Sequence, residues 1–340
     1  MSFNIKLVFD KELNDEIFVL LDYLNKSGFY RSTDKNKSRL DDITFDNIGD
    51  TGIVLKTIPH KYKLMFKKKN NIDKATTKRC ALCEAIQNLN KIKPLDKAKS
   101  LLWRGYIIRP NDFPYMDNHL LILSSNHNHG YGNLGTQDMI IENKDVIHDM
   151  LALYKLMDFK GTMFFNGLAG NTQLHYHFHY TTETLPVQKY LYKYDIESEK
   201  DNLNQYLTKN GTNLFLFNSR KYYCFNGIFL YGKIENVGND IFKIIKKIKD
   251  KKKEFNIVLI PKNENDHSKE NVSAIIYMRD NSKLKDTDPA LGASIVSGYY
   301  TREDITRKDV NKKIIEKFIR RICSIAVVKP NLEIINSVLK

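Results

Sequence analysis

Three histidines stand at every second position in the stretch GNTQLHYHFHY at residues 170–180: His175, His177 and His179. Side chains alternate faces along a β-strand, so the three imidazoles are expected on one face, with about 6.7 Å between successive ones. The alternate residues are apolar or aromatic and are expected to pack into a core: Leu174, Tyr176, Phe178 and Tyr180. Because a buried imidazole without a partner costs free energy, the histidine face predicts a cleft or a metal site.

Three interpretations of this strand stay open on its own residues. A metal site is the first, because H-x-H pairs recur in zinc and iron enzymes. Nucleophilic catalysis is the second, in which one neutral imidazole attacks a phosphorus atom while its neighbours orient it. A purely structural role is the third. Three histidines on one strand face, directly after a loop of glycine, asparagine and threonine, argue against the structural role.

The segment before the histidines favours phosphate chemistry. In FNGLAGNTQLH, Gly167 and Gly170 let backbone N–H groups approach an anion closely. Polar side chains of the same segment add hydrogen bonds: Asn166, Asn171 and Thr172. A site for a metal alone has no need of such a phosphate cradle. The net charge of +14 also suits an anionic ligand, although an AT-rich coding sequence produces the same excess of lysine.

Cysteine usage and the N-terminal residues bear on the compartment. The segment MSFNIKLVFDKELND has acids where a secretory signal has an apolar core, so a cytoplasmic protein without a disulfide framework is expected. The C-x-x-C pair Cys80 and Cys83 then predicts a metal or redox site. Cys224 and Cys323 lie in apolar sequence and are interpreted as buried core thiols. No run approaches the ~20 apolar residues of a membrane span.

The histidine strand ends a series of predicted elements. Alternating apolar residues predict strands over LLWRGYIIRP and NHLLILSSNHNHG, and helical spacing predicts a helix over 144–158. The run GTMFFNG is predicted as a strand, after which the glycine-containing loop leads into the histidines. The order is therefore strand, strand, helix, strand, loop and strand.

A second set of elements repeats this order without the chemistry. It comprises two strands, a basic amphipathic helix and two further strands: NLFLFNS, KYYCFNGIFLYGK, DIFKIIKKIKDKKKEF, FNIVLIPKN and VSAIIYMRD. We therefore expect an α+β fold made of a duplicated unit, with antiparallel sheets and helices packed on one face. The expected divisions are an N-terminal substrate-shaping segment at 1–75, a catalytic repeat at 76–185 and a degenerate second repeat at 186–340.

Two separated motifs carry a resemblance to a known family. The run NGLAGNTQLHYHFH resembles the signature of the histidine-triad superfamily, whose members transfer or hydrolyse nucleotidyl groups, and NDFPYMDNHLLILSSNH resembles its partner hairpin. The duplication is similar to the galactose-1-phosphate uridylyltransferase branch, which includes diadenosine tetraphosphate phosphorylases and GDP-hexose phosphorylases. RCALC followed by RPNDFP, and the late segment LGASIVSGYYTRED, resemble the same branch. Both expected repeats would thus be histidine-triad units.

The resemblance implies a covalent nucleotidyl-histidine intermediate, with His177 as the nucleophile that attacks the α-phosphorus of a nucleotide. His179 would donate a hydrogen bond to the nonbridging oxygens or protonate the leaving group. Uridylyltransferases carry glutamine at that position, so the choice between phosphorolysis and hydrolysis stays open. The nucleotide and its phosphates would be bound by the cradle and the hairpin: Asn111, Asn166, Gly167, Gly170, Asn171 and Thr172.

A structural zinc ion is also implied by the resemblance. Its ligands would be Cys80, Cys83, His127 and His175, with His129 as the alternative to His127. Two thiolates and two imidazoles suit the tetrahedral coordination of structural zinc. The competing interpretation is a pair of free thiols, or a site whose metal has been lost. A divalent cation that accompanies the nucleotide is a further candidate cofactor.

The expected function is a nucleotidyltransferase of the phosphorylase type with ping-pong kinetics. Its substrate would be a nucleoside diphosphate sugar or a dinucleoside polyphosphate, and phosphate or a sugar phosphate would be the acceptor. One alternative is a histidine-triad hydrolase or deadenylating enzyme that uses water. Another is a catalytically inactive module that binds nucleotides or nucleic acid. The resembling families also suggest a homodimer.

Other titratable residues carry weaker signals. Lys262 and Arg279 follow apolar strands of the second repeat and are candidates to reach the acceptor phosphate. The basic run KKIKDKKK at 246–253 is typical of a solvated helix face rather than of a nucleic-acid contact. Four other histidines have no motif support for catalysis: His60, His119, His148 and His267.

Overall fold

A computed structural model of the chain provides the coordinates. It describes residues 5–27, 43–57, 82, 100–111, 114–125, 137–170, 175–193, 204–218, 225–261, 268, 270–280, 282, 284, 292–302, 311–325, 327, 329–330 and 332–339. None of the helices among these residues is both long enough and apolar enough to cross a membrane.

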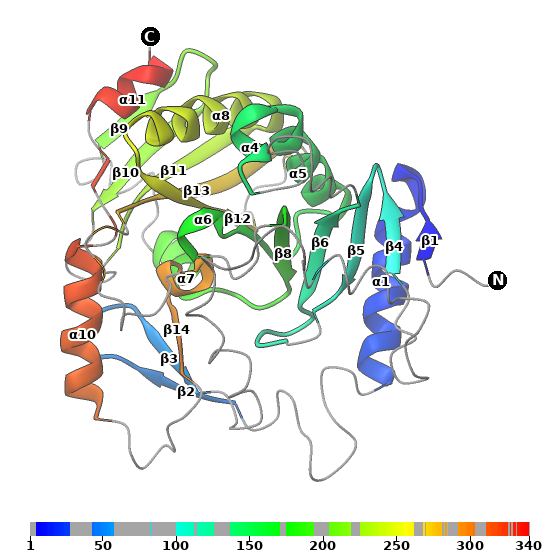
Figure 1. Ribbon diagram of the computed structural model, residues 1–340, viewed down its shortest axis with the longest axis horizontal. Coiled ribbons are helices and arrows are strands. Elements are labelled where there is room, and N and C mark those ends of the chain that lie inside the picture. Colours follow the sequence, from blue (N-terminus) through cyan, green and yellow to red (C-terminus); the bar gives the residue numbers. More distant parts are fainter. Residues whose placement is uncertain are drawn as a thin grey trace.

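Two sets of five strands form most of one large sheet (Figure 1). The first set is β4 (Ser100–Trp103), β5 (Tyr106–Pro110), β6 (Leu120–Ser124), β7 (Thr162–Phe165) and β8 (His177–Thr181). The second set is β9 (Asn204–Leu207), β10 (Asn213–Asn218), β11 (Asn226–Lys233), β12 (Glu254–Ile260) and β13 (Asn271–Arg279). Each set places its one long helix between the third and fourth strands, which confirms the duplicated α+β unit.

The strand order shows how the two halves join. It runs β1-β4-β5-β6-β8-β7-β12-β13-β11-β10-β9, so the halves meet where β7 pairs with β12 and each half extends outward in the same order. All neighbouring pairs are antiparallel except β1 (Ile5–Leu7) with β4. A continuous sheet therefore connects the histidine strand, β8, to the second half through β7.

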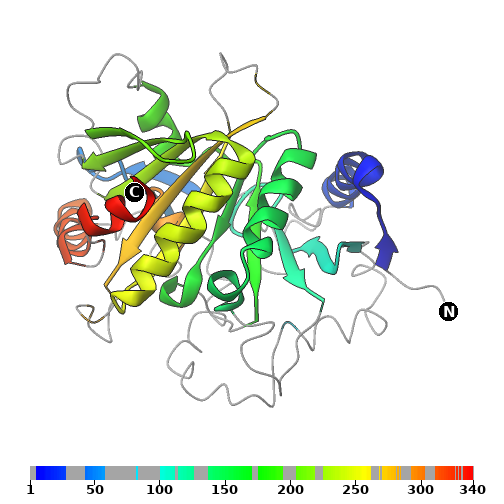
Figure 2. The same ribbon diagram turned by 90° about the horizontal axis from the view of Figure 1, so that it is seen from above.

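One face of the sheet is covered by helices, as expected. The helices α5 (Asp145–Leu156) and α8 (Ile234–Asp250) lie side by side over it in Figure 2, with α4 (Met139–Glu142) and α11 (Leu332–Leu339) packed against α8. The helix α1 (Asp10–Lys26) covers the end formed by β1 and β4. Apolar residues of these helices and of the sheet form one continuous core.

The opposite face carries a smaller three-stranded sheet and four further helices of the described residues. Its strands are β2 (Thr44–Asn47), β3 (Val54–Thr57) and β14 (Tyr299–Arg302) in the order β14-β3-β2. The helices are α6 (Gly167–Gly170), α7 (Pro186–Lys193), α9 (Ala293–Val296) and α10 (Lys312–Ile325). In this sheet, β3 of the expected 1–75 segment pairs with β14 of the expected second repeat. The predicted divisions of the chain at residues 75 and 185 stay predictions.

Two predicted elements have different limits in the structure. The run LLWRGYIIRP forms two strands rather than one, because Arg104 and Gly105 both have positive φ (45° and 83°) and form the tight turn of the hairpin β4–β5. The helix expected to begin at residue 240 begins at Ile234, directly after β11. Helical periodicity does not reveal such a direct strand-to-helix junction.

Cys323 corrects an interpretation made from the sequence. Its side chain is buried in α10, as expected, but it takes part in a disulfide bond rather than remaining a thiol. The other three cysteines of the chain, Cys80, Cys83 and Cys224, lie outside the described residues. Apolar flanking sequence predicts burial only, because a disulfide depends on the approach of two Cβ atoms in the folded chain.

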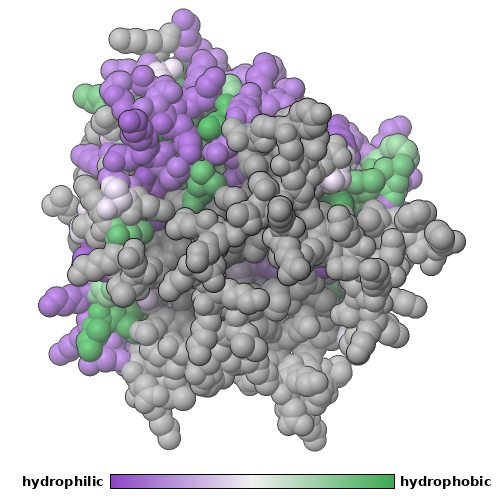
Figure 3. Space-filling view, in the orientation of Figure 1, coloured by the Kyte–Doolittle hydropathy of each residue, from purple (hydrophilic) through white to green (hydrophobic). Residues whose placement is uncertain are grey.

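The basic run at the end of α8 forms ion pairs. Lys247 and Lys251 contact the carboxylate of Glu333 in α11, and Lys249 lies 2.7 Å from Glu254. The surface over α8 and α11 is hydrophilic in Figure 3. The pairs with Glu333 link α8 to α11, and the pair with Glu254 links α8 to β12.

The close approach of α6 to β12 predicts the effect of a small substitution. Gly167 has a φ of +58°, and a Cβ on it would lie 2.3 Å from the carbonyl oxygen of Phe255. Gly167→Ala is therefore expected to lower the free energy of unfolding by about 2–4 kcal/mol, measured by chemical denaturation. Gly211→Ala is the matched control, since Gly211 has a φ of +80° but a Cβ there would be 3.8 Å from the nearest atom. Equal losses in the two variants would contradict a cost from the contact with Phe255.

Candidate functional site

The histidine row lies in the middle of the first half of the sheet. β8 pairs with β6 on one side and β7 on the other, so that His179 faces Leu121 and Phe164. His175, just before β8, and the two following histidines are all buried, with at most 7% of each exposed. Tyr176, Phe178 and Tyr180 point into the helix-side core, as the alternation predicts. The three imidazoles therefore share the face that carries the small sheet.

Hydrogen bonding holds His177 in one tautomer. Its Nδ1 lies 2.7 Å from the backbone carbonyl oxygen of His175, and a carbonyl can only accept, so Nδ1 carries the proton. The side-chain nitrogen of Gln137 donates to the same carbonyl at 2.9 Å and also lies 2.8 Å from Nδ1 of His177. Burial lowers the pKa of His177, which keeps the ring neutral. Among the described residues, none forms a hydrogen bond with Nε2, which therefore presents the lone pair of a nucleophile.

The tautomer of His179 follows from a backbone donor. The N–H of Ala293 in α9 donates to Oδ1 of Asn166 at 2.7 Å, so the amide nitrogen of Asn166 faces His179. That nitrogen donates to Nε2 of His179 at 3.1 Å, and the proton of His179 is therefore on Nδ1. Nδ1 in turn lies 2.9 Å from Nε2 of His119. Both ring nitrogens of His179 are thus engaged inside the protein, and Phe164 stacks on the ring with the two planes 7° apart.

His119 belongs to this network, although no sequence motif supported it. It is fully buried, and the side-chain amide of Asn111, a predicted nucleotide-binding residue, lies 3.3 Å from its ring nitrogens. Burial, reinforced by the positive charge of Lys56, lowers the pKa of His119 to about 3. A signal was present: His119 stands two residues before Leu121, the partner of His179, and therefore on the same face of the sheet.

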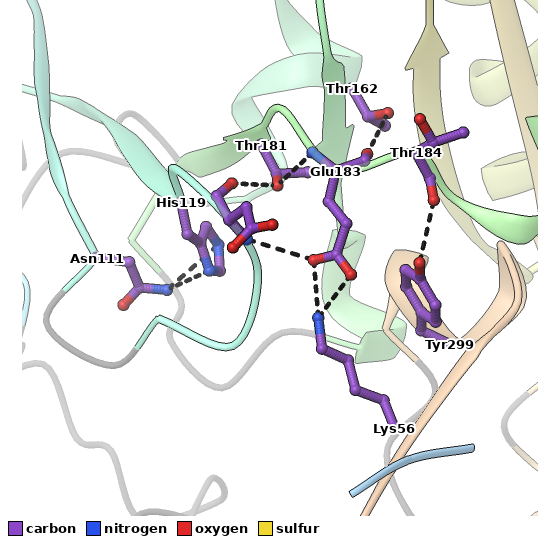
Figure 4. Close-up of polar contacts among 9 residues, drawn as sticks. Lys56, Asn111, His119, Thr162, Thr181, Glu183, Thr184 and Tyr299 are labelled. Atoms are coloured by element: carbon purple, nitrogen blue, oxygen red, sulfur yellow. Dashed lines mark hydrogen bonds and ion pairs between the residues drawn. The ribbon is translucent and has the colours of Figure 1, made fainter. Parts of the chain in front are cut away.

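A buried ion pair lies next to His119 (Figure 4). Nζ of Lys56, on β3, lies 2.8 and 2.7 Å from the two carboxylate oxygens of Glu183, which follows β8. The ammonium group also lies about 5 Å from the ring centres of Phe45 and Tyr299, at 5.2 and 5.0 Å. Burial lowers the pKa of Lys56, and the Glu183 charge opposes that effect. The segment before residue 58 thus contributes a fixed cation beside the histidine network.

The predicted cradle and zinc residues are described only in part. Gly167 and Gly170 form α6, directly after Asn166, whereas Asn171 and Thr172 lie outside the described residues. Five other predicted residues also lie outside the described residues: Cys80, Cys83, His127, His129 and Lys262. Of the zinc set, His175 alone is described, and its Nε2 donates to the carbonyl of Ser124 at 2.8 Å. No group of three or more potential metal ligands is found within the described part of the chain.

Comparisons with known proteins bear on the fold. The sequence matches no family model and no curated protein. Among solved structures, yeast Ap4A phosphorylase Apa2 superposes with a TM-score of 0.51 at 11% identity, covering 93% of this chain and 94% of that one. The complex of Apa2 with Ap4A gives a TM-score of 0.50 at 13% identity, covering 94% of this chain and 98% of that one. This chain has the histidine-triad fold. An ADP-glucose phosphorylase from Arabidopsis thaliana also matches, with a TM-score of 0.31 at 11% identity, covering 82% and 98%.

The buried histidines of this fold predict a loss of stability in acid. His119 has a pKa of about 3 when folded and about 6.5 when unfolded, so the unfolded state binds more protons between these values. Folding stability therefore falls as the pH drops below about 6.5. Between about pH 8 and pH 5, the free energy of unfolding of His119→Gln is expected to fall by about 2 kcal/mol less than that of the wild type. Urea denaturation at the two pH values measures this difference. The wild-type slope in His119→Gln would refute the assignment.

Proposed function

We propose that the protein is a nucleotidyltransferase of the phosphorylase type that forms a covalent intermediate on His177. The observation that carries the proposal is the hydrogen bond from Nδ1 of His177 to the carbonyl of His175, which leaves Nε2 as a neutral nucleophile. The fold supports it, since Ap4A phosphorylase Apa2 superposes over most of both chains. A dinucleoside polyphosphate or a nucleoside diphosphate sugar is the proposed substrate class.

The chemistry divides into two transfers at phosphorus. In the first, the lone pair of Nε2 attacks the α-phosphorus, the bond from phosphorus to the bridging oxygen breaks, and the remaining phosphate chain leaves. The nucleotidyl group is then bound covalently to Nε2. Nδ1 keeps its proton and continues to donate a hydrogen bond to the carbonyl of His175. In the second, an oxygen of orthophosphate or of a sugar phosphate attacks the same phosphorus and the imidazole leaves. The carbonyl stabilises the positive charge that the ring acquires between the two steps.

The contacts of His179 support a role other than that of an acid. Its two ring nitrogens are bonded to Asn166 and His119, and burial lowers its pKa well below the usual value. A neutral ring with both nitrogens engaged has no proton to give to a leaving group. We therefore propose that His179 holds the site in shape and that a phosphate-bearing acceptor, rather than water, completes the reaction.

We also propose a structural zinc ion, bound by Cys80, Cys83, His175 and either His127 or His129. Nε2 of His175 already donates to the carbonyl of Ser124, so coordination would use Nδ1. A backbone carbonyl on the second nitrogen is the arrangement that orients most metal-bound histidines, and His175 fits it. The ion would hold the chain before residue 84 against the histidine strand. It would take no part in the transfer.

The intermediate can be observed directly. Incubation with Ap4A or ADP-glucose, followed by rapid acid-free quenching and mass spectrometry, is expected to show an adenylyl group on His177. His177→Ala should remove the adduct and reduce turnover by at least about 1,000-fold, because no other group supplies the nucleophile. His148→Ala, in α5, should leave both unchanged. Full turnover in His177→Ala with every substrate that the wild type cleaves would rule out the mechanism.

The acceptor can be identified by leaving it out. With substrate present and phosphate removed, turnover is expected to stop after about one equivalent of the first product per active site, which is the burst of a ping-pong enzyme. Adding orthophosphate or a sugar phosphate should restore steady turnover. Equal steady rates with and without these acceptors would instead establish water as the acceptor and the protein as a hydrolase.

Metal content tests the zinc proposal independently of activity. Elemental analysis of the purified protein is expected to give about one zinc per chain. Cys80→Ser combined with Cys83→Ser should remove it and lower the melting temperature. Separate His127→Ala and His129→Ala variants distinguish the two candidate ligands, since only one of them should lose the metal. A wild-type protein without zinc, purified from zinc-supplied cells, would contradict the proposal.

A further inference from the structure

A chain of hydrogen bonds leads from the second half of the sheet to the histidine row. Arg279, at the end of β13, donates from Nη1 to Oδ1 of Asn256 on β12 at 2.8 Å. The side-chain nitrogen of Asn256 donates to the backbone carbonyl of Asn166, which follows β7. The side chain of Asn166 then bonds to Nε2 of His179. Three residues therefore connect a strand without histidines to the third histidine of the row.

The donor and acceptor roles in this chain have one consistent assignment. A guanidinium has no acceptor, so Arg279 must donate and Oδ1 of Asn256 must face it. The reverse orientation of the Asn256 amide would place nitrogen against nitrogen on one side and oxygen against the carbonyl of Asn166 on the other. Both hydrogen bonds would be lost. The cation of Arg279 thus fixes which way Asn256 points.

Burial makes the arrangement rigid. Arg279 and Asn256 are both fully buried, so a polar atom of either that lost its hydrogen bond would remain unsatisfied in the interior. Burial lowers the pKa of Arg279 to about 9, which leaves the guanidinium charged near neutral pH. Gly167, the residue after Asn166, also packs against Phe255, the residue before Asn256. Gly167 has no Cβ, and the carbonyl of Phe255 occupies the space that a Cβ would take. The backbone of Asn166 is therefore held by β12 at two successive residues.

We propose that Asn256 is a positioning residue for His179: through the backbone of Asn166, the second half of the sheet fixes the tautomer of His179. The donor of Asn256 sets where the Asn166 backbone lies, and the N–H of Ala293 sets how its amide is turned. Together they present an N–H to Nε2 of His179. The consequence for catalysis rests on the proposed function, whereas the consequence for the tautomer does not.

The tautomer can be measured without any substrate. Long-range proton–nitrogen NMR spectra of the full-length protein, labelled with nitrogen-15 in histidine, distinguish a ring protonated at Nδ1 from one protonated at Nε2. In the wild type at about pH 7.5, His179 is expected to carry its proton on Nδ1. Observation of the Nε2–H form in the wild type would overturn the proposal before any variant is made.

Two variants remove the donor of Asn256 in different ways. Asn256→Asp keeps an acceptor for Arg279 but places a carboxylate oxygen against the carbonyl of Asn166, and Asn256→Ala removes the amide without adding charge. Either folded variant is expected to show a mixture of His179 tautomers. Asn271→Ala, at the other end of β13, is the matched control, because Asn271 also donates a side-chain hydrogen bond, to Tyr231 at 2.8 Å. An unchanged His179 signal in the Asn256 variants, or an equal change in the control, would refute the proposal.

Activity provides a second readout that a general loss of stability would not imitate. In single-turnover reactions with Ap4A or ADP-glucose, the Asn256 variants are expected to form the His177 adduct about 10- to 100-fold more slowly, because the site is misaligned. The KM for the nucleotide should change much less, since Asn256 contacts no substrate. If the wild type forms no adduct, the proposed function fails while the NMR result still decides the role of Asn256. A normal adduct rate with altered tautomers would limit that role to structure.

Discussion

Burial of a histidine row inside a β-sheet is the constraint on which the rest of the site depends. An imidazole removed from water must stay neutral, and each ring nitrogen that contacts the protein must meet a group of the complementary kind. His177 meets this condition at the carbonyl of His175, and His179 meets it at Asn166 and His119. Each tautomer assignment rests on a backbone group with a fixed role: the carbonyl of His175 can only accept a hydrogen bond, and the N–H of Ala293 can only donate one. The backbone of the fold thus determines which nitrogen of each ring carries the proton.

The same constraint involves parts of the chain that carry no catalytic motif. Asn166 is held from β12 by Asn256 and from α9 by Ala293, and both lie in the second half of the chain. On the other side, Lys56 and Glu183 tie the small sheet to the end of β8 and place a cation near His119. The half of the sheet that lacks the histidine row therefore helps to position residues of the half that carries it.

Sequence patterns predicted the elements whose periodicity is regular and local. The helix α5 and the strand β8 lie where alternation and helical spacing place them, and the duplicated α+β arrangement is confirmed. The hairpin turn at Arg104 was missed, since a strand-like apolar pattern continues across it. Within the hydrogen-bonded network, His177 and Asn166 had been predicted by motif. His119 and Gln137 had not, because alternation places His119 on one face with Leu121 but does not give the pairing with β8 or the approach of Gln137.

By itself the sequence determined that three imidazoles share one face of a strand and that a glycine loop precedes them. Both follow from the two-residue period of a strand and from the conformational freedom of glycine, which are local properties. The tertiary structure decided the tautomer of His179. The carbonyl that orients His177 belongs to a residue only two positions away, whereas the proton position on His179 depends on the amide of Asn166 and on the backbone N–H of Ala293, which is 127 residues from Asn166. Such roles are set by distance in space, which residue order does not encode.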